Sequence, residues 1–375
     1  MKKKKFLFIL LALIFIYALW LSFLLLRFKT YKLPSTYTSP LEIEGVYHIH
    51  STFSDGQKHP DIIASVASLS SLDFIILTDH GNPNFESISS QGWKEGVLVL
   101  AGSELSVNRG HLVALGFDLP DSNFSQTAEE AVYQIKALKG FSIIAHPFSK
   151  VQWSWGKFID YSGIEIINAD TMLRKDIHRS LPYLPALLIK PKYALLKMLV
   201  RPEKNLKRWD LLNSQHPIFG YFSSDAHRLY RPVFSLLRLH PLLKNQLSED
   251  FETAKCQVYD ALREGRFFNA IDAAAQAKGF RFWGEKGEKR IQMGKTIVAD
   301  SPINLHIETS SPFAKETLLI HNGKAVLRSL KNTISYEAAL AGTYRVEVYL
   351  KEKSPLGKNI PWILSNPIFI REKKQ

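Results

Sequence analysis

The sequence predicts an α/β fold in which helices alternate with the strands of a parallel sheet, open or closed into a barrel. Short apolar runs such as 74–77 and 141–145 alternate with stretches of helical periodicity such as 60–72, an alternation typical of strand–helix–strand units. Polar residues follow directly after several of these runs, where parallel α/β folds place their active sites. The length of 375 residues, with 46% hydrophobic and 22% charged residues, suits one large α/β domain and a smaller one.

The N-terminus has the composition of a membrane segment. Four lysines precede a run from Phe6 to Leu26 that contains no charged residue. Its length is roughly the 20 residues that a helix needs to span a bilayer. The run is longer and bulkier than the core of a secretory signal peptide, and no small-residue cleavage site follows it. Residues 1–29 are therefore predicted to form an uncleaved signal anchor, a single-pass transmembrane helix with a cytoplasmic N-terminus and an extracytoplasmic body.

The remainder of the chain is predicted to form a tether and two domains. Residues 30–42 are polar and proline-containing, as expected of a tether. Residues 43–278 carry the strand–helix alternation and are interrupted at 172–213 by a leucine-rich, basic helical insertion. That insertion could cover the site or rest on anionic lipid, but the composition favours an ordinary insertion with a solvated basic face. Residues 279–375 show short apolar runs and turns, which predict a small β-sandwich.

The charge of the chain narrows its class of partners. There are 48 Lys and Arg residues against 35 Asp and Glu residues, which gives a net charge of +13. A basic balance favours small anionic molecules, phosphorylated ones above all, and lipid head groups. The sequence shows no nucleic-acid module, so nucleic acid is not an expected partner. The single cysteine, Cys256, excludes an internal disulfide framework.

Histidines and carboxylates gather at the ends of the predicted strands. His48 and His50 lie two apart, and side chains two apart on a strand point to the same face, so both imidazoles could bind one ion. An isolated pair of this kind is more often two polar residues on a strand face. This pair is accompanied by seven further candidates. The candidate ligands are His48, His50, Asp55, His80, Glu104, His111, His146, Asp225 and His227.

This set of residue types indicates a hydrolytic metal centre. Imidazole and carboxylate ligands suit zinc, manganese or iron, and the absence of cysteine from the set is unlike a purely structural zinc site. Nine ligands are too many for one ion and fit two or three divalent ions joined by a bridging carboxylate. Such a centre activates a bridging water and stabilises a leaving oxygen. The predicted reaction is hydrolysis of a phosphate ester, with a metal-bridging hydroxide as the attacking group.

The same residues form an ordered set of motifs. In chain order they are His48-Ile49-His50 with Asp55-Gly56, Thr78-Asp79-His80, Glu104 with His111, Ala145-His146-Pro147, and Ser224-Asp225-Ala226-His227. This set, spread over residues 46–270, resembles the PHP (polymerase and histidinol phosphatase) superfamily of metal-dependent phosphoesterases. Segments 163–168 and 359–367 resemble its carbaryl-hydrolase-like branch, which adds a C-terminal β domain.

The resemblance implies a distorted (β/α)7 barrel with a trinuclear site. It assigns one ion to His48, His50, Glu104 and Asp225, a second to Glu104, His111 and His146, and a third to Asp55, His80 and His227. Glu104, Asp225 and His227 are the residues expected to act most directly in catalysis. Asp at position 55, in place of the more common His, implies a weaker third ion. Asp79 is expected either to orient His80 or a neighbouring ligand, or to be a turn residue.

The substrate side chains are less constrained by the sequence. Arg109, Lys150 and Arg228 lie near candidate ligands and could clamp an anion, although each is also typical of a surface cation. Two other functions stay open. The same site could hydrolyse a carbamate, an amide or a carboxyl ester, or the chain could be a non-catalytic binding protein at the cell surface.

Overall fold

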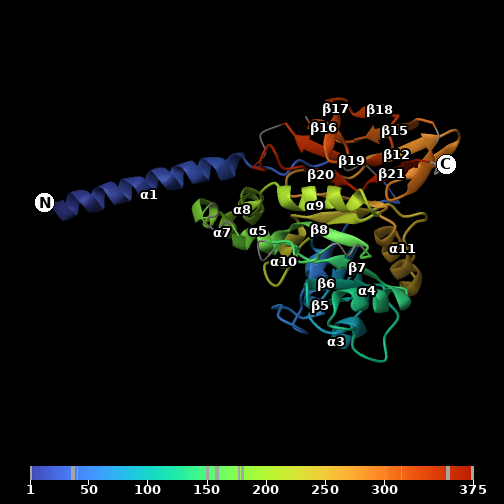
Figure 1. The fold of residues 1–375 in the computed structure, drawn as a ribbon. Helices are drawn as coiled ribbons and strands as arrows, with labels where there is room; N and C mark the ends of the chain where they lie inside the picture. The colour runs from blue at the N-terminus through green and yellow to red at the C-terminus, as the bar shows by residue number, and fades with distance from the viewer. Residues whose placement is uncertain are drawn as a thin grey trace.

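The structure is a computed structural model that describes residues 2–34, 39, 41–148, 152–156, 160–175, 178, 181–299, 301–313, 315–351 and 355–372. It is a mixed α/β fold from which one long N-terminal helix projects (Figure 1). The described helices are α1 (Lys2–Arg27), α2 (Pro60–Ser68), α3 (Phe85–Ser89), α4 (Ala128–Ala137), α5 (Ala169–Lys175), the 3₁₀ helix η1 (Leu181–Tyr183), α7 (Ala186–Ile189), α8 (Pro191–Met198), α9 (Glu203–Asn213), α10 (Tyr230–Phe234) and α11 (Phe251–Arg263).

The described strands of the N-terminal two thirds are β1 (Gly45–Ile49), β2 (Phe74–Leu77), β3 (Gly92–Lys94), β4 (Val97–Ala101), β5 (Ser103–Val107), β6 (Gly110–Leu115), β7 (Phe141–Ile144), β8 (Gly163–Asn168), β9 (Phe219–Ser223), β10 (Arg238–Pro241) and β11 (Phe267–Ala270). Those of the C-terminal third are β12 (Arg281–Lys286), β13 (Lys289–Gln292), β14 (Thr296–Ala299), β15 (Ile303–Glu308), β16 (Lys315–His321), β17 (Lys324–Ser329), β18 (Thr333–Ala338), β19 (Gly342–Leu350), β20 (Ile363–Ser365) and β21 (Ile368–Glu372).

The sheets that surround the candidate site are mixed, whereas the sequence predicted a parallel sheet. In the long sheet, β1, β2 and β4 are parallel, but β10 pairs antiparallel with both β1 and β11. In the second sheet, β5, β6 and β7 are antiparallel, and β7, β8 and β9 are parallel. The connection from β5 to β6 is too short for a crossover helix, so these two strands form a hairpin instead.

Both ends of the second sheet, β5 and β9, adjoin the long sheet. Only Gly102 separates β4 from β5, and a Cβ atom there would overlap the carbonyl oxygen of Ala114 on the neighbouring strand. At the other junction, Ile49 bridges to Ala226, just after β9. The ends of β1 and β9 are thereby held together, which brings the polar residues that follow them to one place.

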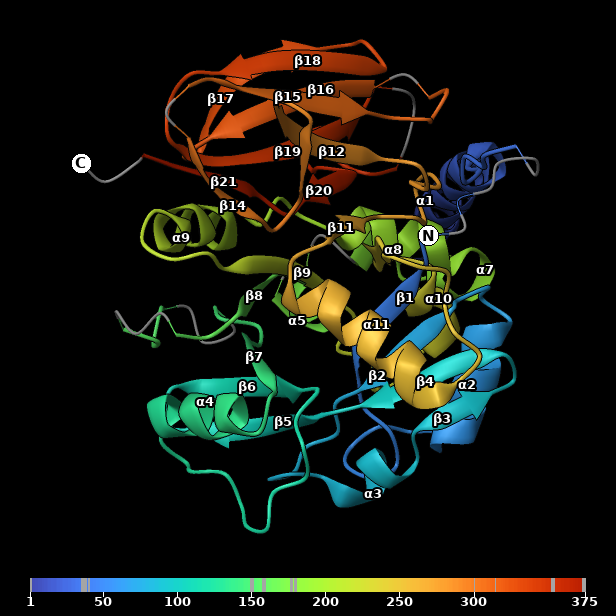
Figure 2. The same ribbon diagram turned by 90° about the vertical axis from the view of Figure 1, so that its right-hand side faces the viewer.

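The C-terminal strands continue the long sheet. Its order is β14-β21-β19-β20-β11-β10-β1-β2-β4-β3, with β16 paired to β19 and β17 to β16. The sequence-based boundary at 278/279 therefore falls within one hydrogen-bonded sheet, because β20 pairs with β11 (Phe268 opposite Ser365). Strands β13, β12, β15 and β18 form a separate antiparallel sheet beyond it (Figure 2). The larger hydrophobic core of the described residues runs from Ile43 to Ile370, and a small second one joins α1 to α7 and α8.

The expected helical insertion at 172–213 extends from within α5 to the end of α9. Its last helix, α9, is hydrogen-bonded to the C-terminal strands. On α9, Asp210 accepts two hydrogen bonds from Arg345 of β19, at 2.9 and 3.0 Å. Arg345 also pairs with Glu347 and is almost fully buried. Trp209 of α9 is completely buried in the core. This end of the insertion is therefore part of the packed body and not a mobile surface addition.

Helix α1 is long and apolar enough to cross a membrane. A signal sequence near the N-terminus would have the same length and composition. Most of its surface is exposed in the structure (Figure 1). The residues after it, expected to be a loose tether, are bonded to the body: Thr30 Oγ1 donates to the carbonyl of Ala273 at 3.0 Å, and Tyr31 N donates to that of Ala274 at 3.2 Å. Residues 35–38 and 40 of the predicted tether lie outside the described residues.

A buried ionic cluster joins the start of the α/β part to the C-terminal strands. His240 of β10 lies 3.0 Å from Glu42 Oε1 through Nδ1 and 2.9 Å from Asp272 Oδ2 through Nε2. Arg281 donates to Glu42 at 2.6 Å. Burial opposes the charge on His240, but Asp272 and Glu42 outweigh burial and raise its pKa to about 10. The imidazolium is therefore a shared counterion for two buried carboxylates.

Replacing His240 with glutamine should lower the free energy of unfolding by about 3–5 kcal/mol near neutral pH, because the buried carboxylate of Asp272 loses its cation and that of Glu42 keeps only Arg281. The folded-state pKa lies above the unfolded value of about 6.5, so the stabilisation is complete below that pH and is lost as the pH rises toward 10. Urea unfolding of the detergent-solubilised chain at several pH values would measure it. His216→Gln, at an exposed histidine, is the control. A stability difference that does not shrink between pH 6.5 and 10 would contradict the assignment.

Candidate metal centre

Nine side chains from separate segments meet where the two sheets adjoin. They are the nine candidate ligands of the sequence, and the structure brings all of them into four overlapping groups whose ligand atoms lie within 4.8 Å of one another. His48 lies on β1, Glu104 on β5 and His111 on β6. The other six follow strands: His50 and Asp55 follow β1, His80 follows β2, His146 follows β7, and Asp225 and His227 follow β9.

At the centre of the cluster, two imidazole nitrogens face two carboxylate oxygens around a small cage. His48 Nε2 lies 3.3 Å from Glu104 Oε2 and 3.5 Å from Asp225 Oδ1. His50 Nε2 lies 3.2 and 3.4 Å from the same two oxygens. An ion that is bound tetrahedrally at 2.0–2.1 Å separates its ligands by about 3.3 Å. Both Nε2 atoms are buried, and neither has a hydrogen-bond partner within the described part of the chain. These four residues therefore fit a divalent ion.

Glu104 belongs to more than one ligand group. Its Oε1 atom lies 2.9 Å from both His111 Nδ1 and His146 Nε2. Its Oε2 atom faces His48 and His50 and lies 3.4 Å from His80 Nδ1. Burial raises the pKa of this carboxyl group, but the surrounding histidines, His48 first, outweigh burial and hold the pKa well below its ordinary value. An ionised carboxylate with one oxygen directed to each side is suited to bridge two ions.

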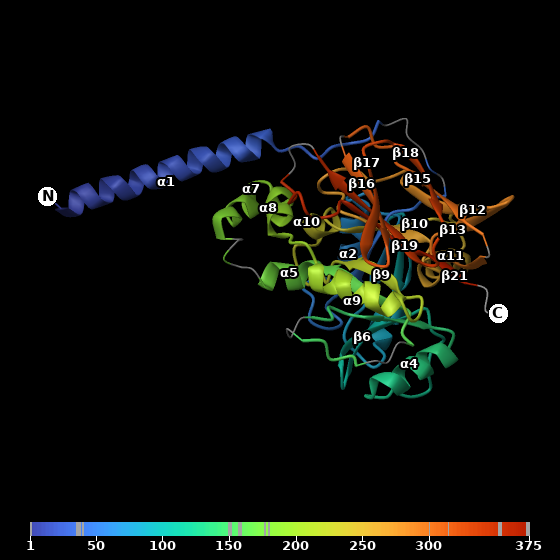
Figure 3. The same ribbon diagram turned by 45° about the horizontal axis from the view of Figure 1, so that its top comes forward.

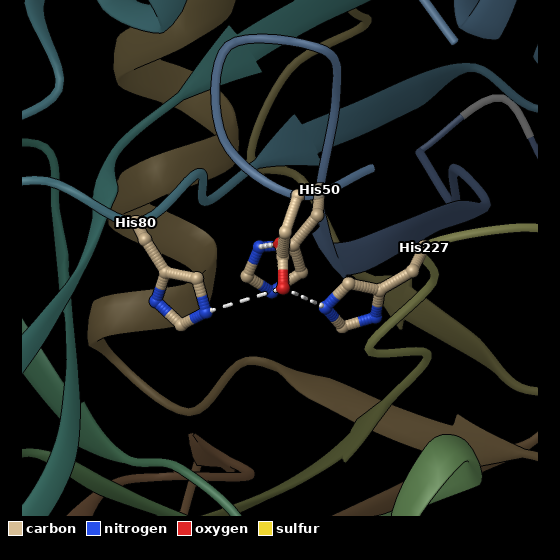
Figure 4. Close-up of side chains that lie close together, drawn as sticks. His50, His80 and His227 are labelled. Carbon is tan, nitrogen blue, oxygen red and sulfur yellow. Dashed lines mark ion pairs between the residues drawn. The ribbon is translucent and has the colours of Figure 1, made fainter. Parts of the chain in front are cut away.

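A more exposed group lies beside this centre. Figure 4 shows His50, His80 and His227 directed at a common point. Asp55 Oδ2 lies 3.1 Å from His227 Nε2 and 3.8 Å from His80 Nε2, and Asp55 Oδ1 lies 3.3 Å from His50 Nδ1. The side chain of Asp55 is 54% exposed, whereas that of Glu104 is 1% exposed. The hydrogen bond from His50 holds the pKa of Asp55 below its ordinary value.

The backbone departs from regular geometry at three ligands. His48, His146 and Asp225 have φ values of 65°, 27° and 48°, a region that non-glycine residues seldom adopt. The β1–β2 register shifts between Tyr47 and Ile49, which makes His48 a bulge residue. The alternation of an ordinary strand, on which the sequence analysis placed both His48 and His50, was therefore the wrong reason for their convergence. The bulge rotates His48, and His50 follows after the strand has ended.

A fully buried carboxylate, Glu165 of β8, orients the cluster from behind. Its Oε1 atom lies 2.6 Å from His48 Nδ1 and accepts a hydrogen bond from Tyr47 at 2.6 Å. Its Oε2 atom accepts hydrogen bonds from His146 N at 2.7 Å and from Asn168 Nδ2 at 2.9 Å. Burial raises the pKa of Glu165, but His48 outweighs burial and lowers it. With Nδ1 of His48 bonded to this carboxylate, Nε2 is left to face the cage.

The carboxylate of Asp79 is hydrogen-bonded to the loop that follows β1. It accepts hydrogen bonds from Ser51 N at 2.6 Å, Ser51 Oγ at 2.8 Å and Ser54 Oγ at 2.6 Å. Ser54 Oγ in turn lies 3.4 Å from His50 Nδ1 and from Asp55 Oδ1. The loop also needs Gly56, because a Cβ atom there would overlap the carbonyl group of His50. Asp79 thus fixes the loop that carries Asp55.

The cluster opens into a cavity of about 350 Å³. Besides ligand residues, its lining includes Asp170, Thr171 and Arg174 of α5. Arg174 pairs with Asp170 at 2.6 Å, and its side chain is 67% exposed. A second cavity of about 380 Å³ shares His146 and Thr171 with the first and continues along Met172 and residues 200–205. A substrate with an anionic part and a larger second part would have room here.

The two predicted anion-binding cations that the structure describes, Arg109 and Arg228, do not line the cavity into which the cluster opens. Arg109 lines a neighbouring cavity together with the ligands His111 and His146. It pairs with Glu129 and donates to the carbonyl of Ser154 at 3.2 Å. Arg228 is exposed and lines none of the three cavities described for this region. Lys150 lies outside the described residues.

Two contributions to the site were missed by residue-type reasoning. In the sequence, Glu165 is the one charged residue within an apolar run that predicts a strand. Because a buried carboxylate needs a partner, this charge was the signal that could have indicated its role. Arg174 lies in a helix that no strand-end rule predicts to line the site.

Replacing Glu165 with glutamine should weaken metal binding by about 10- to 100-fold, because the imidazole of His48 loses its negative partner. Competition with a chromophoric chelator would measure the affinity for zinc and manganese. Glu129→Gln, which removes a carboxylate outside the cluster, is the matched control. Equal affinities in the two variants would mean that Glu165 has only a structural role.

The chain was compared with known proteins. No protein-family model matches it, and no curated protein matches its sequence. Among solved structures it is similar to a two-domain protein from Bacteroides vulgatus that contains a predicted PHP-like metal-dependent phosphoesterase, with 16% identity, a TM-score of 0.47, and coverage of 91% of this chain and 99% of that one.

Two further structures match a smaller part of the chain. One is an amidohydrolase from Chromobacterium violaceum with bound sulfate and no metal (15% identity, TM-score 0.34, 49% of this chain and 87% of that one). The other, from Bifidobacterium adolescentis, is described as a proposed metal-dependent phosphoesterase (13% identity, TM-score 0.35, 57% and 95%). Independently of these comparisons, the cluster of His, Asp and Glu residues could hold metal ions.

Proposed function

We propose that this protein hydrolyses a phosphate ester with the help of two or three divalent metal ions. The observation that carries the proposal is the cage of His48, His50, Glu104 and Asp225, in which two buried imidazole nitrogens lie 3.2–3.5 Å from two carboxylate oxygens. Glu104 extends this cage toward His111 and His146, and Asp55, His80 and His227 offer a third position. We expect that third position to be the weakest, because Asp55 is the most exposed ligand.

The protein supplies position and charge, and the ions supply the Lewis acidity. Bound divalent ions polarise a phosphoryl oxygen, lower the pKa of water and stabilise a leaving oxygen. Glu165 and Asp79 hold ligands or ligand-bearing loops in place through short hydrogen bonds. We propose Asp225 and His227, which line the cavity at the cluster, as the residues nearest to the reacting groups. Arg174, which lines the cavity, replaces Arg109 and Arg228 as the proposed anion-binding cation.

The architecture that we propose for this function is the PHP barrel. The chain link at Gly102 and the bridge from Ile49 to Ala226 join the two sheets around the ligands, which is compatible with a closed, distorted barrel over residues 43–278. Residues 279–375 would then be a β domain that shares a sheet edge with the barrel. We further propose that residues 1–29 anchor the chain in a membrane with the metal centre on the extracytoplasmic side, as the N-terminal lysines favour.

Loading the metal-stripped protein with manganese, zinc or iron should restore hydrolysis of phosphomonoester or phosphodiester reporters. Asp225→Asn should lower kcat/KM by at least about 100-fold, because one cage ligand loses its charge. Asp118→Asn, at an exposed ion pair with Lys139, is the matched control. If only carboxyl esters, carbamates or amides were hydrolysed in a metal-dependent way, the same site would act on one of these bonds and not on a phosphate ester. Failure to bind metal would leave a non-catalytic binding protein.

Arg174→Gln should lower kcat/KM for a phosphate ester by about 10- to 100-fold, mainly through KM, because one charge-assisted hydrogen bond to the anion is lost. Arg228→Gln should change neither parameter appreciably. Steady-state kinetics on the metal-loaded protein would measure both. A larger effect at Arg228 would restore the assignment that the sequence alone suggests.

A further inference from the structure

The segment from η1 through α7 exposes large apolar side chains. Leu181 is 52% exposed, Leu184 39%, Leu188 92% and Ile189 67%. Four large apolar side chains are thus exposed within nine positions, a concentration that a protein in water seldom presents without a partner.

This segment lies beside the last turns of α1. Tyr17 donates a hydrogen bond to the carbonyl of Pro182 at 2.7 Å, and Lys190 Nζ donates to that of Leu25 at 2.6 Å. Leu21 and Leu25 are buried in one apolar cluster with Ala186 of the segment and with Tyr193 and Ala194 of α8. Figures 1 and 3 both show α7 and α8 alongside α1. Because a helix rises 1.5 Å per residue, contacts from Tyr17 to Leu25 extend over about 12 Å of α1.

The side chains between the two elements are those of a membrane–water boundary. Trp20 lies 6.0 Å from Tyr17 and 6.2 Å from Tyr183, and Tyr183 lies 6.1 Å from Tyr193, all measured between ring centroids. Lys197 lies over the rings of Tyr183 and Tyr193 at 5.9 and 5.8 Å. Trp and Tyr gather at the head-group level of membranes, and lysines extend their charge toward it.

We propose that residues 181–189 insert into the leaflet from which α1 emerges and form a second contact of this chain with the lipid bilayer. Leu188 and Ile189 lie among the acyl chains, and Lys190 and Lys197 lie at the head groups. The overlap of about 12 Å with α1 is of the order of the 5–10 Å to which interfacial helices are buried. The proposal rests on α1 as a membrane anchor, since that helix fixes the depth.

The contact has a consequence for the site. Helix α8 packs against α5, and α5 supplies Thr171 and Arg174 to the lining of the cavity. The segment in the membrane and the entrance of the cavity are therefore two ends of one packed unit.

The test uses the full chain in vesicles of phosphatidylcholine and phosphatidylglycerol. Cys256, which is exposed, is replaced by serine, and a single cysteine with an environment-sensitive fluorophore is placed at Leu188. Leu340→Cys, at a residue 65% exposed beside β19, is the matched control in the C-terminal strands. Phe15→Cys, at a residue 63% exposed on α1, reports whether the anchor is in lipid. Nitroxide-labelled lipid and aqueous iodide serve as quenchers.

We expect the probe at Leu188 to be several-fold brighter than that at Leu340, quenched by nitroxide lipid and protected from iodide. Quenching of Leu188 by iodide as at Leu340, with Phe15 quenched by lipid, would overturn the insertion and leave the anchor intact. Protection from both quenchers would also overturn it, because a protein surface would then cover the segment. None of these readouts depends on hydrolysis, so failure of the proposed reaction is distinguished from failure of this contact.

Discussion

The carboxylate of Glu104 is the interaction on which the site depends. It is buried, it is ionised because histidines surround it, and each of its oxygens faces a different set of imidazoles. A buried anion without compensation is among the most costly features that a fold can contain. Segments from both sheets must therefore converge on this one residue, and the link at Gly102, the bulge at His48 and the bridge between Ile49 and Ala226 all serve that convergence.

The ligand types could be predicted from the sequence, and so could the places of the six ligands that follow strands, because apolar runs typical of buried strands precede them. The reason why His48 and His50 converge could not be predicted, because it is a bulge in the β1–β2 pairing and the residue types at these positions do not indicate a bulge. Glu165 was visible as a charge within an apolar strand, but its partner lies more than a hundred residues away in the chain. Arg174 lines the cavity through helix packing, which no local pattern reports.

The fold class could be predicted from the sequence, but two features of strand pairing could not. Alternation of apolar runs and helices was sufficient for a mixed α/β fold. It did not reveal that β5 and β6 form a hairpin, since the antiparallel pairing depends on a short connection rather than on strand composition. Nor did it reveal that β20 adds to the edge of β11, because an edge strand is completed by whichever strand the rest of the chain delivers to it.

The hydrogen bonds that connect residues 30–33 to residues 273–276 restrict how the body of the chain can move relative to α1. A flexible linker would let the body turn independently of the helix. Because this junction is hydrogen-bonded, the body turns together with α1. If α1 anchors the chain in a membrane, as proposed above, one face of the body stays toward the membrane plane, and encounters with a substrate then depend on its height above the lipid surface and on lateral diffusion.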